Sequence, residues 1–329
     1  MPPTNRAAPG CAAGRLRATE FTKIPIRHVR TDFVQWFGDR HDGAMETAVT
    51  AKGGVVVEAG YYFGDDKGKN IVDVSSQAGC PNKCVFCDLG KEKFVRNLTK
   101  EEIIDQVRLV LLLAGGYGFD LDNTKHKIDF GKTGEPLLNG AIVPAVEKLA
   151  ELSFSYKLCT TFPDSRMAYE NFRALARFAS RHSEPFQPQI SLVSTSEAYR
   201  RRVIGTNIAS FDQLRASAEQ WANQNPEGRR INLSIILSED TPCDVRDVYG
   251  TLPPELFNMR IRKYVATAHG RQNGLHTADD ARIRRIQESF REKGYSVRDE
   301  AMPTAVELRS GLASNVTRRR YIGMIDGKG

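Results

Sequence analysis

The sequence has no apolar run long enough to cross a membrane. A spanning helix needs roughly 18 or more uncharged apolar residues, whereas the apolar run at residues 109–114 is short and is flanked by Arg108 and Gly115. Residues 1–17 also lack the apolar core of a secretion signal, and we expect them to be poorly ordered. These absences predict a soluble, cytoplasmic protein with no membrane partner.

The sequence also lacks an internal repeat and a long low-complexity tract, which argues against a solenoid. Its 329 residues, with 40% apolar content, are enough for one large α/β domain. The net charge is +7, and basic triplets lie at residues 200–202 and 318–320. Such triplets are compatible with a phosphate-bearing partner, but we favour solvated surface arginines because no aromatic residues are interleaved with them.

Strand and helix patterns alternate along the chain. Residues 21–39 are mixed and predict a short N-terminal element, while β-rich runs at 55–63 and 71–75, separated by Gly64-Asp65-Asp66, predict a hairpin. A capping box of Thr99 and Glu102 predicts a helix that begins near residue 100. Further strands are expected near 128–130, 156–160, 189–193, 231–237 and 259–266, and helices over 141–152, 167–180 and 278–293, the last between Thr277 and Gly294. This alternation favours parallel strands, with chemistry at their carboxyl ends.

Six cysteines lie at positions 11, 80, 84, 87, 159 and 243, and three of them fall in the segment Cys80-Pro81-Asn82-Lys83-Cys84-Val85-Phe86-Cys87. This clustering suits metal binding in a reducing compartment better than a disulfide framework. A cubane iron–sulfur cluster normally has four thiolate ligands, so a three-cysteine loop leaves one iron with an open coordination site. The other three cysteines look incidental.

A structural zinc site is the alternative explanation of this loop. Such a site is closed by four protein ligands and usually pairs two distant Cys or His dyads. The fourth ligand would have to be Cys159, Cys243 or a histidine, and the chain has no second Cys-x-x-Cys and no His-x-x-His pair. We therefore favour an iron–sulfur cluster.

The cysteine spacing, with Phe86 directly before the third cysteine, resembles the radical S-adenosylmethionine (SAM) superfamily. Neighbouring residues resemble its ribosomal RNA adenine methyltransferases over roughly residues 42–316, through the segments Val74-Ser75-Ser76-Gln77-Ala78-Gly79-Cys80, Arg96-Asn97-Leu98-Thr99 and Gly134-Glu135-Pro136-Leu137-Leu138-Asn139. The resemblance implies an α/β fold, a partial TIM-type (β/α)6 barrel at residues 67–316. An N-terminal extension (1–40), partly disordered, and a β-hairpin lead-in (41–66) would precede it, and a C-terminal tail (317–329) would follow.

The resemblance also implies the cofactors. Cys80, Cys84 and Cys87 would hold a [4Fe–4S] cluster whose open iron binds SAM, and an electron from a low-potential donor such as flavodoxin or ferredoxin would give a 5′-deoxyadenosyl radical. Glu135, between Gly134 and Pro136, would accept hydrogen bonds from the methionine ammonium; its alternative is a surface turn residue. Ser191, Thr267, and Thr160 or Thr161 match other cofactor-binding positions, although strand-end hydroxyls also serve as local backbone partners.

The chain departs from those methyltransferases at both of their methyl-transfer cysteines. The methyl-carrying cysteine precedes a glycine in a late loop, where this chain has Ser310-Gly311. The second lies seven residues before the first cluster cysteine, where this chain has Asp73. A serine hydroxyl is far less nucleophilic than a thiolate, so Ser310 should not carry a methyl group. Only about 40 residues precede the similarity, so we do not expect the family's helical RNA-binding domain.

We therefore expect a radical SAM enzyme that modifies a non-ribosomal substrate by hydrogen abstraction, such as a small metabolite, nucleotide or peptide on a biosynthetic route. The alternatives are a radical SAM methyltransferase or modifier of RNA adenine, and a non-catalytic metal-stabilised binding protein. Asp73 would act as a base or bind a substrate amine, with Ser310 in the same cavity, unless Asp73 simply faces water at a strand end. Tyr264 and His269, near the end of a strand, would donate hydrogen or protons, unless they only pack or face solvent.

Overall fold

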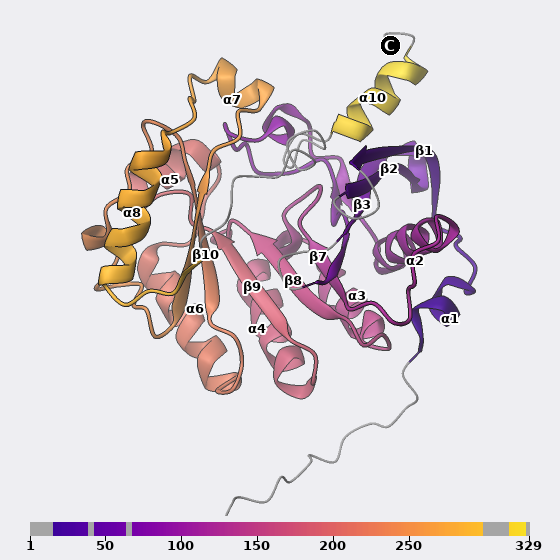
Figure 1. The fold of residues 1–329 in the computed structure, drawn as a ribbon, viewed down its shortest axis with the longest axis horizontal. Coiled ribbons are helices and arrows are strands. Elements are labelled where there is room, and N and C mark those ends of the chain that lie inside the picture. Colours follow the sequence, from indigo (N-terminus) through magenta and orange to yellow (C-terminus); the bar gives the residue numbers. More distant parts are fainter. Residues whose placement is uncertain (1–15, 39–42, 64–67, 299–315, 327–329) are drawn as a thin grey trace, which may run out of the picture.

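The computed structural model describes residues 16–38, 43–63, 68–298 and 316–326, and within these residues ten strands form one curved sheet (Figure 1). The strands lie in the order β1-β2-β3-β4-β7-β8-β9-β10-β11-β12. From β4 onward all neighbours are parallel. These strands are β4 (Asn70–Asp73), β7 (His126–Phe130), β8 (Ser155–Thr160), β9 (Phe186–Ser191), β10 (Ile231–Leu237), β11 (Phe257–Lys263) and the short edge strand β12 (Val297–Arg298). The predicted partial barrel is confirmed.

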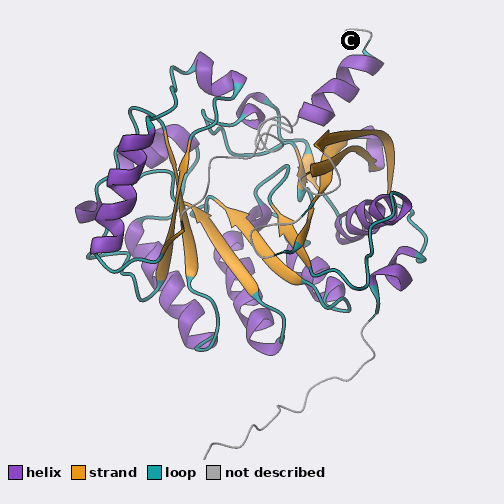
Figure 2. Cartoon of the chain, in the orientation of Figure 1, coloured by secondary structure: helices purple, strands orange, loops and turns teal. Residues whose placement is uncertain are grey.

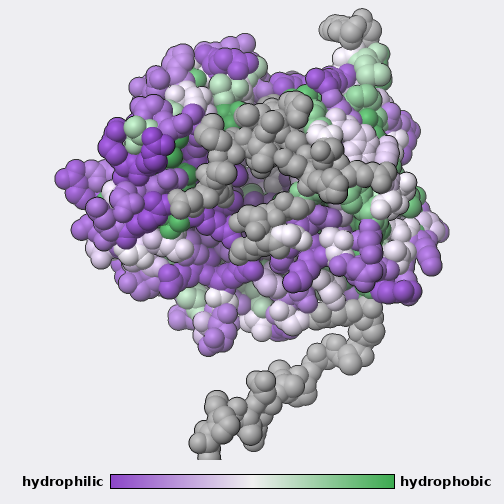
Figure 3. Space-filling model, viewed as in Figure 1, coloured by the Kyte–Doolittle hydropathy of each residue, from purple (hydrophilic) through white to green (hydrophobic). Residues whose placement is uncertain are grey.

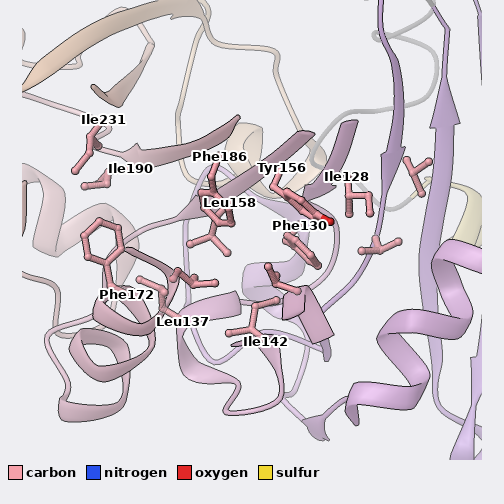
Figure 4. Close-up of a cluster of buried hydrophobic side chains, with 14 of the residues drawn as sticks. Ile128, Phe130, Leu137, Ile142, Tyr156, Leu158, Phe172, Phe186, Ile190 and Ile231 are labelled. Atoms are coloured by element: carbon pink, nitrogen blue, oxygen red, sulfur yellow. The ribbon is translucent and has the colours of Figure 1, made fainter. Parts of the chain in front are cut away.

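Helices cover one face of the parallel strands, as Figures 1 and 2 show for α3, α4 and α6. The helices are α2 (Lys100–Gly116), α3 (Ile142–Leu149), α4 (Arg166–Arg181), α5 (Glu197–Ile204), α6 (Phe211–Gln224), α7 (Ala268–Gln272) and α8 (Asp280–Glu292). Alternate strand residues such as Ile128, Phe130, Tyr156 and Leu158 are buried with helix residues such as Phe172 (Figure 4). Because strand side chains alternate in direction, the residues between them point to the opposite face of the sheet, which we call the inner face.

Antiparallel strands extend the sheet at its other edge. They are β1 (Val29–Gly38), β2 (Gly43–Ala51) and β3 (Val56–Tyr62), preceded by the short helix α1 (Ala18–Thr22). The predicted hairpin is present, since β3 pairs antiparallel with β4. The predicted strand ranges include neither β1 nor β2, although β2 lies within the lead-in expected at residues 41–66. Almost every residue of β2 is buried, so its sequence lacks the apolar–polar alternation of a one-sided strand.

Helix boundaries follow the capping residues. The capping box predicted for α2 is present: the N–H of Glu102 lies 3.2 Å from Thr99 Oγ1, and the N–H of Thr99 donates to a Glu102 carboxylate oxygen at 2.8 Å. Helix α8 begins at Asp280 instead of residue 278, because Asp279 accepts the N-cap hydrogen bond from Arg282 N at 2.6 Å. Thr277 pairs with Ser238 in an isolated bridge instead.

Three further differences have local causes. Strand β9 begins at Phe186, three residues before the predicted start. The strand contains Pro188, and because proline argues against a central strand, the sequence pattern favours a later start. We predicted no helix between residues 194 and 230, where α5 and α6 lie. Arg200 on α5 is 1% exposed, so the first basic triplet is not wholly a solvated face.

The C-terminal residues that we expected as a tail form helix α10 (Val316–Ile325), which lies beside β1 and β2 (Figure 1). The backbone N–H of Thr317 donates to Glu58 Oε1 at 3.1 Å, and this threonine is fully buried. Among the described residues, no helix combines the length and apolar character needed to span a membrane. Ser310 lies outside the described residues.

Candidate active site

The cysteine loop leaves the sheet after β4 and is closed by a small antiparallel pair, β5 (Gln77–Ala78) with β6 (Arg96–Asn97). Gly79, directly before Cys80, has φ +73°. A Cβ at this position would lie 2.0 Å from the carbonyl oxygen of Lys93, so the closure requires glycine. Helix α5 supports the loop, since the N–H of Val85 donates to the carbonyl of Val203 at 2.8 Å.

The three loop cysteines are gathered in a buried setting. Cys80 and Cys84 are less than 10% exposed, and Cys87 is partly buried. Burial raises the pKa of Cys80 to about 12 and that of Cys87 to about 11, and it raises the pKa of Cys84 as well. Charge on Cys87 also raises the pKa of both other thiols, so the three thiols lie near one another.

This donor set fits the cluster predicted from the sequence. Thiolates buried without a cation are unfavourable, and iron would remove their protons on binding. The backbone N–H groups of Leu89 and Gly90 lower the pKa of the Cys87 thiol and so oppose the effect of burial, and N–H groups near a ligating sulfur tune iron–sulfur centres. Among residues that the structure describes, no three Cys, His, Asp or Glu side chains are grouped to hold a single metal ion.

Glu135 lies beside the cysteine loop and is 2% exposed, so the interpretation of it as a surface turn residue is wrong. One carboxylate oxygen accepts from the Thr160 hydroxyl. The other accepts from the N–H and the hydroxyl of Thr161, at 2.8 and 2.9 Å. Asn82 of the cysteine loop adds a weaker contact of 3.4 Å. Burial raises the pKa of Glu135, and the hydrogen bonds from Thr160 and Thr161 oppose that shift.

The residues around Glu135 leave little freedom for its loop. Gly134 has φ +114°, and a Cβ there would lie 2.7 Å from the Cβ of Gln77. Pro136 is the first residue of a short 3-10 helix over Pro136–Leu138. Lys132, two residues before Gly134, is buried and donates to Glu46 of β2 at 2.7 Å. The loop is therefore fixed to both the cysteine loop and the antiparallel strands.

Two of the hydroxyl side chains predicted to lie near the cofactor are at strand ends: Thr160 is the last residue of β8 and Ser191 is the last residue of β9. Thr160 both donates to Glu135 and accepts from the backbone N–H of Phe162 at 2.8 Å, so it orients Glu135 and also serves as a local backbone partner. Ser191 is the last residue of β9 and is partly buried. Phe162 and Val193, just beyond these strands, have φ of 59° and 68°. Such values are strained for a bulky residue and cluster at functional sites.

Helix α7 brings the late site residues to the cysteine loop. Thr267, its N-cap, donates to the carbonyl of Phe86 at 3.0 Å, and the N–H of His269 donates to Asp88 at 2.8 Å. These contacts flank Cys87 on both sides. The buried Tyr264 hydroxyl accepts from the N–H of Thr267 at 3.2 Å. A small cavity here is lined by Phe86, Val193, Tyr199, Val203, Ile236, Ser238, Thr241, Tyr264 and Leu275.

Among the described residues, Asp73 forms no hydrogen bond with those around Cys87. It is the last residue of β4, and its side chain points to the inner face of the sheet. It is paired in register with Asp129 of β7, and its carboxylate accepts from the N–H of Gly131 at 3.0 Å. Burial, together with the charge of Asp129, raises the pKa of Asp73 to about 7. The structure thus brings Glu135 and Thr267 to the cysteine loop, places Ser191 at the end of β9, and leaves Asp73 beside a second carboxylate.

Sequence reasoning missed two residues next to that pair. Lys157 donates to Asp129 at 2.7 Å, and the Cys159 thiol lies 3.5 Å from the other oxygen of Asp129. We had regarded Cys159 as incidental. The alternation of apolar Tyr156 and Leu158 in the predicted strand was the signal that could have assigned both residues to the inner face.

Comparison with curated proteins finds relatives for part of the chain. The dual-specificity RNA methyltransferase RlmN of Pseudomonas entomophila is 37% identical over 115 residues, 35% of this chain and 30% of that protein. The probable dual-specificity RNA methyltransferase RlmN of Chlorobium phaeobacteroides is 41% identical over 91 residues, 27% of this chain and 25% of that protein. The chain thus spans about a third or less of the length of these relatives. No family model matches it.

Comparison with solved structures agrees on the fold. A radical SAM methyltransferase from Sphaerobacter thermophilus superposes with a TM-score of 0.67, covering 88% of this chain and 82% of that one, at 19% identity. The resemblance inferred from the cysteine loop and its neighbouring segments is confirmed. Over about a third of its length the chain is similar in sequence to proteins named as dual-specificity RNA methyltransferases. Over most of its length it is similar in fold to a protein named as a radical SAM methyltransferase.

Proposed function

We propose that this chain is a radical SAM enzyme. Cys80, Cys84 and Cys87 would hold a [4Fe–4S] cluster, which supplies the reductive cleavage of SAM to a 5′-deoxyadenosyl radical. The observation that carries the proposal is that the buried thiols of Cys80 and Cys84, together with the partly buried Cys87, lie in one loop beside the buried Glu135 carboxylate. A reduced flavodoxin or ferredoxin would provide the electron.

The chain's own residues would position SAM. Thr160 and Thr161 hold the Glu135 carboxylate in one orientation, so little reorganisation is needed when it accepts hydrogen bonds from the ammonium group of SAM. Asn82, at 3.4 Å, makes the longest of the contacts to Glu135. We expect the incoming ammonium to take its place.

The comparisons favour a methyltransferase or RNA modifier over the non-ribosomal substrate that we expected from the sequence. The curated relatives are named as dual-specificity RNA methyltransferases, and the solved structure is named as a radical SAM methyltransferase. Our first candidate is therefore a radical SAM modifier of RNA adenine. It would need a route that does not use a cysteine at position 73.

Two observations support the second candidate, a radical enzyme acting on a non-ribosomal substrate. Asp73 replaces a family cysteine with a carboxylate that can accept a proton from the substrate. In addition, two arginines of the last basic triplet are already paired within the protein: Arg318 with Glu92 at 2.6 Å and Arg319 with Asp88 at 2.8 Å. They contribute less to a phosphate-binding surface than the sequence alone indicated.

The experiment uses the full chain, reconstituted anaerobically with iron and sulfide and reduced with dithionite. Release of 5′-deoxyadenosine from SAM, lost in Cys84→Ser, supports the radical SAM assignment, and its absence from the reconstituted wild type refutes it. Ribosomal RNA transcripts are then added with methyl-labelled SAM. A labelled adenine supports the first candidate, whereas unlabelled RNA with continuing 5′-deoxyadenosine release contradicts it and favours the second.

A further inference from the structure

Arg200 is a buried cation that forms no ion pair within the described residues. It lies on α5 and is 1% exposed. Glu197, one turn earlier on the same helix, pairs with the exposed Arg201 instead, at 3.2 Å. Burial lowers the pKa of Arg200 to about 10. Because a buried charge is unfavourable unless it is paired or well hydrogen-bonded, the position of Arg200 indicates a specific role.

The guanidinium group of Arg200 holds two backbone carbonyl groups. Its Nε donates to the carbonyl of Leu192 at 2.9 Å, and one terminal nitrogen donates to the carbonyl of Ala209 at 3.2 Å. The group also lies 5.1 Å from the centre of the Phe211 ring, a cation–π contact. Leu192 directly follows β9, and Ala209 is hydrogen-bonded to the segment that follows β8, so both contacts fix turns at strand ends.

The first contact fixes the turn after β9. Leu192 precedes Val193, whose φ of 68° is one that a β-branched residue rarely adopts. The N–H of Val193 donates to the carbonyl of Ser234 on β10 at 3.0 Å. Val193 lines the small cavity beside the cysteine loop, together with Phe86 of that loop. Arg200 therefore helps to hold one wall of this cavity in a strained conformation.

The second contact leads to Glu135. The N–H of Ala209 donates to the carbonyl of Phe162 at 3.0 Å, and Phe162 has the other strained φ, of 59°. The N–H of Phe162 in turn donates to the Thr160 hydroxyl oxygen at 2.8 Å. That hydroxyl donates to the Glu135 carboxylate. A series of contacts thus runs from Arg200 to the carboxylate that we propose for the ammonium group of SAM.

Helix α5 itself contacts the cysteine loop. The N–H of Lys83 donates to the carbonyl of Ile204 at 3.1 Å. The N–H of Val85 donates to the carbonyl of Val203 at 2.8 Å, and Val203 also lines the cavity. The helix therefore contacts the loop that would hold the cluster and, through Arg200, the two turns at the strand ends. The relative positions of these three parts of the site depend on this helix.

We propose that Arg200 is a positioning residue for SAM. It holds the turns after β8 and β9 in the conformation that binds SAM beside the cysteine loop, and it does not itself touch the cofactor. A guanidinium suits this task because its planar fork donates in several fixed directions, whereas the ammonium of lysine is a single point charge. Because the turns are held before SAM arrives, binding requires little further ordering of them. The proposal rests on the proposed function, since it takes SAM as the ligand of this site.

Calorimetry with SAM tests this role apart from catalysis. The full chain is loaded with its cluster and kept without reductant, so that SAM binds and is not cleaved. Arg200→Gln removes the charge and the fork, and we expect it to weaken SAM binding about tenfold or more. Affinity is measured on folded protein of known iron content. A role in stability alone would change the amount of such protein and leave its affinity for SAM unchanged.

Arg201→Gln is the matched control, because Arg201 is the next residue of the same basic triplet and is exposed. It removes the same charge from the same helix and should leave SAM binding unchanged. Arg285→Gln is a second control, because this exposed arginine lies on α8, where the surface is mostly hydrophilic (Figure 3). Arg200→Lys keeps the charge and one donor, so it should bind SAM more tightly than Arg200→Gln and less tightly than the wild type.

Thermal unfolding shows which variants are folded. The proposal is wrong if folded Arg200→Gln binds SAM as tightly as the wild type does. If Arg200→Gln does not fold, Arg200→Lys decides in its place: wild-type affinity of this variant, or its own failure to fold, overturns the proposal. A cluster-loaded wild type that binds no SAM refutes the radical SAM assignment instead, so the two failures are distinguishable.

Discussion

Asp73 and Asp129 stand opposite each other on neighbouring parallel strands, at the carboxyl end of β4 and near the end of β7. Lys157 pairs with Asp129 alone, while Asp73 accepts only a backbone hydrogen bond from Gly131 among the contacts described. The two carboxyl groups therefore differ in their surroundings. Asp129 has a cation, and Asp73 has a neighbouring negative charge that favours its protonated form.

This pairing predicts how stability depends on pH. Burial and Asp129 raise the pKa of Asp73 from 3.8 to about 7, so the folded protein binds a proton there that the unfolded chain has lost. The contribution of Asp73 is fully present below pH 4 and is lost as the pH rises through 7, by up to about 1.4 kcal/mol per pH unit. Urea unfolding from pH 4 to 8 should show a smaller loss for Asp73→Asn than for the wild type. Identical pH profiles would remove Asp73 from this role.

The same residue gives a prediction for turnover. If Asp73 accepts a proton from the substrate, product formation should rise with pH through about 7, where the carboxylate form appears. Asp73→Asn should lose product by roughly 100-fold or more, while 5′-deoxyadenosine is still released. Product and 5′-deoxyadenosine are quantified in the same anaerobic reaction. Undiminished product from Asp73→Asn would show that this carboxylate is not the base.

Because Lys132 forms buried ion pairs, we expect its substitution to lower the free energy of unfolding strongly. Lys132 is 4% exposed and lies 2.7 Å from Glu46 and 3.7 Å from Glu58, both of them buried. Lys132→Met would leave two carboxylates without their cation and should cost about 3–5 kcal/mol of unfolding free energy. Lys148→Met is the control, because its pair with Glu151 is exposed and is worth less than about 1 kcal/mol. Equal effects of the two substitutions in urea unfolding would contradict this account.

We expect substitution of Gly79 to reduce the amount of iron that the protein binds. In Gly79→Ala the new methyl group would collide with the carbonyl of Lys93, 2.0 Å away, so the loop could not close before Cys80. We expect the iron content after reconstitution to fall by more than half. Gly53→Ala has a similar positive φ but no neighbour within 4 Å. It should cost only about 1 kcal/mol and keep its iron. A Gly79→Ala protein with full iron content would contradict this view of the loop.

The chemistry-bearing segments could be predicted from the sequence because their signals are local. The cysteine loop, the Gly134-Glu135-Pro136 segment and the Thr99 capping box each lie within a few residues, and the structure has them where they were expected. Even so, two partners of Glu135, Thr160 at the end of β8 and Thr161 directly after it, follow α3 in the chain. No local pattern links those positions.

The remaining features depend on strand phase or on contacts between distant segments. Strand β9 contains Pro188 and begins three residues before the predicted start, because its pairing with neighbouring strands outweighs the tendency of proline to disfavour a central strand. Helix α10 is held by Glu58 and Glu92, more than 200 positions earlier in the chain. Helix α6 was predictable, since Ser210 and Gln213 form a capping box that we overlooked.

The most direct measurement of the central claim is the iron, sulfide and 5′-deoxyadenosine content of one anaerobic preparation. After reconstitution, the wild type should hold about four irons and four sulfides per chain and release 5′-deoxyadenosine from SAM when dithionite is added. The variant Cys84→Ser, which lacks one of the three thiols, should do neither. Wild-type protein that binds no iron and sulfide, or that holds a cluster yet leaves SAM intact under reduction, would contradict the account.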